Sequence, residues 1–211
     1  DDVISELNTD KITARQMVED CLVAIDDPDG EVQRAFISTY HDRARQQADM
    51  VDHARRQGWA LPKFAGIPLS VKDLFDEAGV VTTAGSIVLK DAAPASKDAI
   101  VVARLKAAGF IVIGRTNMTE FAFSGLGTNV HYGTPRSPYE RDPKNPEIGR
   151  VAGGSSSGSA VSISDRMAVA TIGSDTGGST RAPAAFCGIV GFKPTTNRMP
   201  NHGIFPLSTS F

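Results

Sequence analysis

Near its start the chain carries apolar residues at helical spacing. A capping-box pattern at residues 13–16 precedes this series, and the turn-forming segment DPDG at residues 27–30 follows it. The apolar members are Met17, Val18, Cys21, Leu22 and Ile25. A second series over residues 40–57, with Ala44, Ala48 and Val51 on one face and Gly58 at its end, predicts another helix.

Residues 66–73 (GIPLSVKD) change to an alternating pattern. Ile67, Leu69 and Val71 fall on one face, and Ser70 and Lys72 fall on the other. The alternation predicts a short buried strand. Its final lysine either escapes to solvent at the strand end or meets a partner within the protein.

In the rest of the chain, segments with helical spacing of apolar residues are mixed with strand-like apolar segments. We expect a helix over residues 96–109, with Ile100, Val101, Leu105 and Ala108 on its apolar face, and then a strand over residues 110–114. Further helical segments are predicted at residues 117–123, 159–164 and 181–187, and a strand at 167–172. A polar loop over residues 136–150 is expected at the surface. Helices interleaved with strands indicate an α/β protein.

Composition narrows the classes of function. The chain has 211 residues, a net charge of −2, 41% hydrophobic and 22% charged residues, and no basic run, so no nucleic-acid partner is expected. Two distant cysteines and four scattered histidines indicate neither a disulfide framework nor a metal site, and no cofactor is expected. Without an apolar stretch of membrane-spanning length or a signal pattern, we expect a cytoplasmic protein without a membrane partner.

Two serine- and glycine-rich islands hold the candidate chemistry. They are GGSSSGS at residues 153–159 and GSDTGGSTR at residues 173–181, joined by an apolar segment. Flexible linkers also have such a composition, but linkers are not usually joined by a compact apolar segment. The islands offer hydroxyls beside backbone N–H groups that a ligand can approach closely.

Three interpretations of the nucleophile compete. Residues 154–158 fit G-x-S-x-G with Ser156 as nucleophile, but the preceding residues make a poor strand and only His202 lies downstream. A Ser-x-x-Lys nucleophile is absent. In the third, Ser179 attacks, the backbone amides of Thr176, Gly177 and Gly178 face the oxyanion, and Lys72 is the available base.

At this point the residues resemble a known family. The two islands, extended to Pro183, resemble the amidase signature, and residues 66–73 are similar to the strand that carries the catalytic lysine of that family. Residues 114–121 and 186–195 are also similar to it. The resemblance runs from about Thr13 to the end and implies one amidase signature domain over residues 1–211, with a mixed β-sheet covered by helices. Because the family's chains are longer, we expect this chain to hold the N-terminal half of that fold.

The resemblance also implies a mechanism. Ser179 is the expected nucleophile, Ser155 the bridging serine after a cis peptide bond, and Lys72 the base. The backbone near Ala122 is expected to contact substrate, and Phe123 to line its channel. Lys72 must be neutral to accept a proton, so we expect burial to lower its pKa by about 3. Asp175 and Arg181 are expected to form a structural ion pair, and Ser156, Ser157 and Ser174 to support the site through hydrogen bonds.

The expected activity is hydrolysis of a linear, small-molecule amide. A homodimer is the assembly that we consider. The polar loop at residues 136–150 favours a stand-alone amidase over the glutaminyl subunit of a tRNA-dependent amidotransferase. A non-catalytic fragment that acts as a binding or assembly module is the third alternative.

Overall fold

Four strands form one mixed sheet at the centre of the molecule. The computed structural model describes residues 2–142, 145 and 148–208. The strand order is β1-β3-β2-β4, with β1 (Phe36–Thr39), β2 (Pro68–Lys72), β3 (Ile111–Thr116) and β4 (Ala170–Ile172). β1 runs antiparallel to β3, whereas β2 runs parallel to both β3 and β4. The prediction of an α/β protein with a mixed sheet is confirmed.

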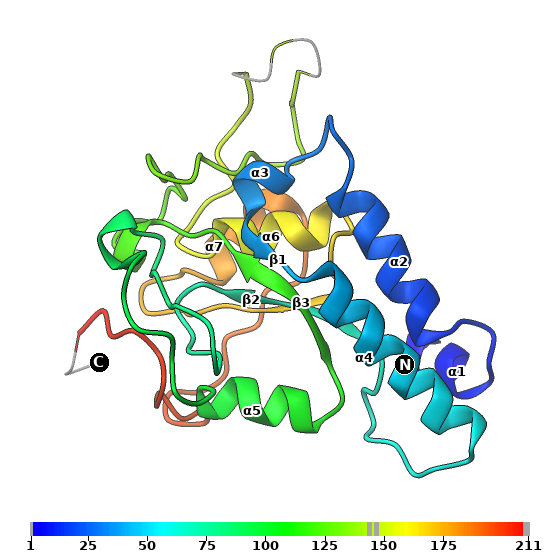
Figure 1. Cartoon of the computed structure of the whole chain (residues 1–211). Coiled ribbons are helices and arrows are strands. Elements are labelled where there is room, and N and C mark those ends of the chain that lie inside the picture. Colours follow the sequence, from blue (N-terminus) through cyan, green and yellow to red (C-terminus); the bar gives the residue numbers. More distant parts are fainter. Residues whose placement is uncertain (1, 143–144, 146–147, 209–211) are drawn as a thin grey trace.

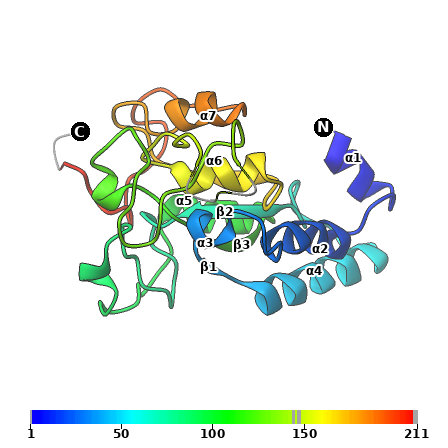
Figure 2. The ribbon, with the colours of Figure 1, turned by 90° about the horizontal axis from the view of Figure 1, so that it is seen from above.

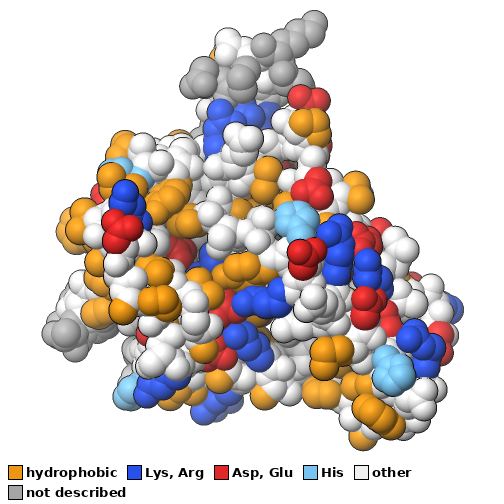
Figure 3. All heavy atoms as spheres, in the orientation of Figure 1, with side chains coloured by type: hydrophobic (Ala, Val, Ile, Leu, Met, Phe, Trp, Pro, Cys, Tyr) orange, Lys and Arg blue, Asp and Glu red, His pale blue; other side chains and the backbone are white. Residues whose placement is uncertain are grey.

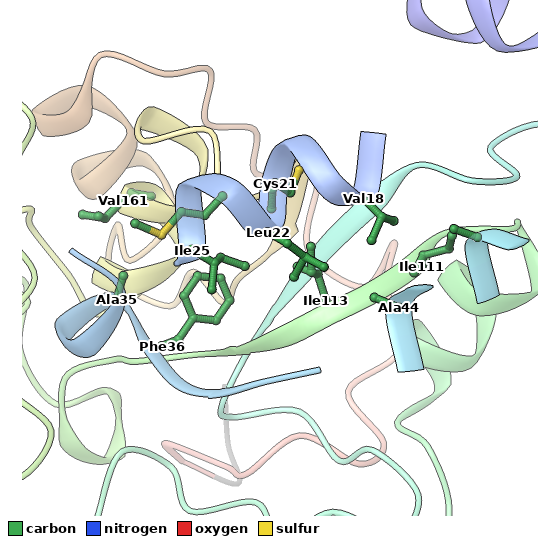
Figure 4. Close-up of a cluster of buried hydrophobic side chains, with 14 of the residues drawn as sticks. Val18, Cys21, Leu22, Ile25, Ala35, Phe36, Ala44, Ile111, Ile113 and Val161 are labelled. Carbon is green, nitrogen blue, oxygen red and sulfur yellow. The ribbon is translucent and has the colours of Figure 1, made fainter. Parts of the chain in front are cut away.

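Three helices cover one face of the sheet. They are α2 (Ala14–Ile25), α4 (His41–Arg56) and α6 (Ser157–Ser164). Ile111 and Ile113 of β3 point into this layer and pack against Leu22 and Ile25 of α2 and Val161 of α6 (Figure 4). α7 (Arg181–Cys187) packs on α6, which lies between α7 and the α2–α4 pair (Figure 2).

The opposite face carries a second apolar cluster. α5 (Ile100–Ala107) lies across the sheet from α2 and α6 (Figure 1). Leu69 and Val71 of β2 and Val112 of β3 pack there with Val101 and Val102. The remaining elements are α1 (Asp2–Asn8), α3 (Val32–Ala35) and the 3-10 turns η1 (Ile87–Leu89) and η2 (Glu120–Ala122).

The alternation of β2 has the predicted consequence. Leu69 and Val71 enter the apolar cluster beside α5, and Ser70 and Lys72 face the layer that holds α6. All residues of β2 are buried. Lys72 therefore does not escape to solvent and ends its strand inside the protein.

The start of α2 combines a local cap with a tertiary one. The Thr13 hydroxyl accepts a hydrogen bond from the Gln16 N–H at 3.0 Å, as the capping-box pattern predicts. The buried carboxylate of Asp52 in α4 accepts the N–H groups of Ala14 and Arg15 at 2.8 and 2.9 Å. This second cap joins segments far apart in sequence, and no local pattern indicated it.

Two predicted helices are wrong in extent. The helix expected from residue 96 begins at Ile100, because Asp98 accepts the Ala78 N–H and Ala99 donates to the Asp76 carbonyl. These bonds hold residues 98 and 99 outside the helix. Its face also differs, since Val102 is buried and Ile100 is 36% exposed.

The helix expected over residues 117–123 is reduced to η2. The Asn117 side chain accepts the Met118 N–H at 2.7 Å and donates to the carbonyls of Arg34 and Gly133, which holds the chain away from helical geometry. Phe121 and Ala122 follow with positive φ angles of 50° and 61°. Of the strand expected at 167–172, Ala170–Ile172 form β4.

The surface carries no dominant charge on the side shown in Figure 3, where acidic and basic side chains are interspersed.

The polar loop expected over residues 136–150 is held to the rest of the protein by ion pairs, which the sequence did not predict. Arg136 pairs with the buried Glu31 and Arg141 with Asp165, although residues 143–144 and 146–147 lie outside the described part of that loop. No helix in the described ranges combines the length and hydropathy needed to cross a membrane.

Candidate active site

The site forms where the parallel strands β2 and β4 end. The two strands pair in register, Leu69 with Ala170 and Val71 with Ile172, so their carboxyl ends lie at the same edge of the sheet. β2 delivers Lys72 to this edge, and β4 leads into the second island. The first island begins α6 at Ser157, and the second begins α7 at Arg181. The topology thus brings both islands and the lysine together.

Lys72 is enclosed by serine hydroxyls. Its side chain is fully buried, and Nζ lies 2.7 Å from Ser155 Oγ, 3.0 Å from Ser156 Oγ and 2.8 Å from Ser174 Oγ. Burial lowers the pKa of Lys72 to about 7, against the attraction of the Asp175 carboxylate, which acts to raise it. The expected lowering of this pKa is present, and a large fraction of Lys72 is neutral near pH 7.

The three hydroxyls are not equivalent. A neutral amine has two N–H donors and one lone pair, so two hydroxyls can accept from it and one can donate to it. The Ser156 hydroxyl donates to the Ser174 carbonyl at 3.3 Å, which leaves it an acceptor toward Lys72. The Ser155 and Ser174 hydroxyls have no other partner within the described residues, so the proton of either is free to point at the lysine lone pair.

Backbone contacts join Ser155 to the second island. The Gly154–Ser155 peptide bond is cis, as expected. The Ser156 N–H donates to the Ser179 carbonyl at 3.2 Å, and the Ser155 carbonyl accepts the Thr119 N–H at 3.1 Å. The Ser179 hydroxyl is half-buried and has no hydrogen-bond partner in the part of the chain that the structure describes. It is available to a ligand.

Asp175 organises the loop around Ser179. Its carboxylate accepts the backbone N–H groups of Gly178, Thr180 and Arg181 at 2.9, 3.2 and 3.3 Å, and the Arg181 guanidinium at 2.9 Å. Burial alone would raise the pKa of Asp175, but Arg181 and these N–H donors outweigh it and hold the pKa at about 2. The expected Asp175–Arg181 ion pair is confirmed.

The structure of this loop contradicts the role predicted for the Gly178 N–H. The Gly178 N–H was expected to face the oxyanion, but it is turned toward Asp175 instead. The reason is that the carboxylate binds successive donors at the start of α7, where positive backbone charge gathers. Gly178 still lines the cavity, while the amides of Thr176, Gly177 and Ser179 have no acceptor among the described residues.

A cavity of about 310 Å³ opens beside Ser179. It contains all the predicted binding positions, and none of the described residues that line it is charged. The lining residues are Ala122, Phe123, Ser124, Gly125, Gly154, Thr176, Gly177, Gly178, Ser179, Ala182 and Leu207. Leu207 was missed, because it lies far along the chain in a segment without a recognisable pattern. A larger cavity of about 600 Å³, near Tyr139 and Phe186, contains none of the predicted site residues.

Other predictions about the islands do not hold. The Ser157 hydroxyl is buried and has no hydrogen-bond partner among the described residues, so it does not support the site as expected. The G-x-S-x-G interpretation lacks its strand, because the described residues that directly precede Ser156 form an isolated bridge at Val151 and no strand. His202 is exposed and its carbonyl accepts the Ile100 N–H beside α5. The described residues contain no group of three or more side chains suited to a metal ion.

Known proteins are similar to this chain in sequence. The chain is 42% identical over 205 residues to the AtzE subunit of 1-carboxybiuret hydrolase from Pseudomonas sp. (strain ADP), with 97% of this chain and 43% of that protein covered. It is 41% identical over 198 residues to a glutamyl-tRNA(Gln) amidotransferase subunit from Koribacter versatilis, covering 94% of this chain and 39% of that protein. The chain therefore spans about two fifths of the length of these relatives.

A solved structure gives the same result. Native peptide amidase from Stenotrophomonas maltophilia matches with a TM-score of 0.83 and 34% identity, over 97% of this chain and 42% of that chain. The sequence profile of the Amidase family matches residues 16–211. This protein therefore belongs to the Amidase family, that of the amidase signature enzymes.

Proposed function

We propose that this protein hydrolyses a carboxylic amide to a carboxylate and ammonia or an amine, through an acyl-enzyme on Ser179. The observation that carries the proposal is the fully buried Lys72, held by hydroxyls at hydrogen-bonding distance beside a cavity that contains Ser179. A lysine that is neutral near pH 7 can act as a base. The names of the relatives, which include hydrolases and amidases, support the same class of reaction.

The proton path begins at the nucleophile. Ser179 Oγ attacks the amide carbonyl carbon as its proton passes to Ser155 Oγ, and the Ser155 proton passes to the lone pair of Lys72 Nζ. The 2.7 Å contact between Ser155 and Lys72 supports this path. Ser156 and Ser174 accept the two N–H groups of the amine and so direct its lone pair toward Ser155.

Negative charge develops on the carbonyl oxygen of the substrate. In the proposed site the amides of Thr176, Gly177 and Ser179 donate to it, and Gly178 shapes the loop without donating. Preorganised backbone donors of this kind contribute about 3–4 kcal/mol each to stabilising a transition state. The hydrogen bonds of Asp175 hold the loop before substrate arrives, so little reorganisation is needed.

The intermediate then collapses and the C–N bond breaks. The leaving nitrogen takes the proton that Lys72 holds, by way of Ser155, and departs as ammonia or an amine. Water attacks the ester of Ser179, and one of its protons passes along the same relay to Ser179 Oγ as the acyl–oxygen bond breaks. The carboxylic acid leaves and gives its remaining proton to solvent, which yields the carboxylate. Lys72 ends neutral and Ser179 regains its proton, so the cycle closes without a cofactor.

Labelling with a fluorophosphonate probe, followed by intact-mass analysis, tests the proposal. We expect one adduct on the purified protein, abolished by Ser179→Ala. Lys72→Ala should slow labelling by at least about 10²-fold, because the proton then has no base to receive it. Ser157→Ala is the matched control, since it removes a serine hydroxyl that has no partner, and it should label like the wild type.

Labelling that survives Ser179→Ala would contradict the proposal and return attention to Ser156. A folded protein that takes no label at all would instead favour the non-catalytic alternative. Both outcomes are read from the same spectra.

A second candidate is that the chain is the hydrolytic subunit of a complex. It is favoured by one observation: the two relatives described above are both named as subunits. In that case the label would appear on Ser179 in a species of mixed composition when the same sample is examined by native mass spectrometry. A labelled protein without other chains would support the stand-alone amidase.

A further inference from the structure

A buried carboxylate follows the candidate base directly in sequence. Asp73 is 1% exposed, and its Oδ1 accepts two hydrogen bonds from the equally buried Arg115 at 2.8 and 3.1 Å. Its Oδ2 accepts the N–H groups of Thr83 and Gly85 at 3.1 and 3.4 Å and the Thr83 hydroxyl. Its carbonyl accepts the Ala84 N–H at 2.9 Å. One residue therefore ties the loop at residues 83–85 to the end of β2.

That loop leads on to the wall of the cavity. The Ala84 carbonyl accepts the Phe121 N–H at 2.8 Å, and the Ala122 N–H donates to the Thr119 carbonyl within the same turn. Ala122 lines the cavity beside Ser179. The Thr119 N–H in turn donates to the Ser155 carbonyl. Hydrogen bonds thus run from the residue after the base, through two loops, to the relay serine.

The backbone of both loops needs such support. Ala84, Phe121 and Ala122 all have positive φ angles, of 52°, 50° and 61°. Residues with a Cβ atom rarely adopt this conformation, and they keep it only where the surrounding structure holds them. The bonds from Asp73 to the first loop, and from that loop to the second, contribute to holding these three residues. The Asn129 side-chain amide also bridges the two loops, because it donates to the carbonyls of Gly85 and Met118 at 2.8 and 2.7 Å.

We propose that Asp73 is a positioning residue for the amidase reaction, which keeps the turn at residues 119–122 in a fixed relation to Lys72 and Ser155. The inference rests on the proposed function. Asp73 touches neither the cavity nor the hydroxyls around Lys72 and acts only through its two loops. Its charge is matched by Arg115, so the pair can be buried without an unpaired ion.

Asp73→Asn tests the inference against Glu77→Gln. Glu77 is a second buried carboxylate of the same cluster, paired with Arg43 and Lys106 and 4.0 Å from Arg115, but it makes no side-chain bond to either loop. We expect Asp73→Asn to lower the rate of fluorophosphonate labelling at Ser179 by on the order of 10²-fold, because small displacements at a reacting centre have effects of this size. Glu77→Gln should label near the wild-type rate at a comparable loss of thermal stability.

Hydrogen exchange supplies a readout that does not depend on activity. The Phe121 amide should exchange faster in Asp73→Asn and not in Glu77→Gln. Thr83→Val, which removes one bond to Asp73 without removing a charge, should show the same effects in smaller measure and covers the case in which Asp73→Asn does not fold.

Two results would overturn the inference. One is wild-type labelling in a folded Asp73→Asn or Thr83→Val variant; the other is an equal loss in Glu77→Gln. An unlabelled Ser179 in the wild-type protein would contradict the proposed function instead, and the exchange of Phe121 would then still decide whether Asp73 holds the turn.

Discussion

The side chain of Lys72 is removed from water, and this burial gives it the lowered pKa that a base requires. A lysine at a strand end normally extends its ammonium group into water. Here the end of β2 is covered by the two serine islands, so the side chain meets hydroxyls, which can bind either protonation state of the amine. The environment holds the lysine in place without a carboxylate at contact distance, which would have kept it charged.

The labelling rate of Ser179 should rise with pH through about 7 and then level, because burial lowers the pKa of Lys72 to about 7 and only the neutral amine accepts a proton. Rates measured between pH 5 and 9 would check this. Asp175→Asn should move the midpoint to lower pH, since the Asp175 charge acts to raise the pKa of Lys72. A rate without any dependence on pH across this range would count against Lys72 as the base.

At the scale of elements, the site depends on how closely α6 approaches the sheet. α6 begins directly after Ser155 and Ser156, and Gly158 lies in its first turn. A Cβ atom at Gly158 would lie 2.2 Å from the Ala35 carbonyl oxygen and 2.7 Å from the backbone of Asn117. The absence of a side chain lets the helix start against the end of α3 and the residue that follows β3, and sets the depth of the serines.

Gly158→Ala should therefore destabilise the protein by about 1–3 kcal/mol through overpacking, although alanine normally stabilises a helix interior. Gly125→Ala is a matched control, because a Cβ atom at Gly125 would have no neighbour within 4 Å. Chemical denaturation of both variants would measure the difference. An equally stable Gly158→Ala protein would show that α6 can move away without cost.

At the scale of the whole molecule, the burial of Lys72 makes the stability of the fold depend on pH. The pKa of Lys72 is about 7 in the folded protein, whereas an unfolded lysine has a pKa of about 10.4. Between these two values the unfolded state binds more protons than the folded state. The free energy of unfolding therefore rises with pH across this window, reaches its full value above the unfolded pKa and decreases as pH falls toward 7.

We expect the free energy of unfolding of the wild type to rise, relative to Lys72→Met, by up to about 1.4 kcal/mol for each pH unit between 7 and 10. Urea denaturation of both proteins at several pH values would measure this difference, which cancels the contributions of all other groups. Below pH 7 the two curves should run parallel. Parallel curves over the whole range would contradict the lowered pKa.

Sequence patterns predicted much of this site because its parts are local. The alternation of β2 placed Lys72 on the polar face, and the second island offered Ser179 beside exposed amides, whereas Ser155 was expected only from the resemblance to the amidase signature. The direction of individual hydrogen bonds could not be predicted. The amide of Gly178 faces Asp175, and Leu207 reaches the cavity, because contacts between separate segments decide both.

The same division applies to the fold. By itself the sequence determined the elements whose period is strong, such as α2, α4 and β2, and the residue types that could carry amide chemistry, since both depend on neighbours along the chain. Tertiary structure alone decided where α5 begins, how Asp52 caps α2 and how Asp73 joins two loops beside the base. Those features depend on donors and acceptors that only folding brings together. Once buried, these groups must pair, because a buried donor or acceptor without a partner costs free energy.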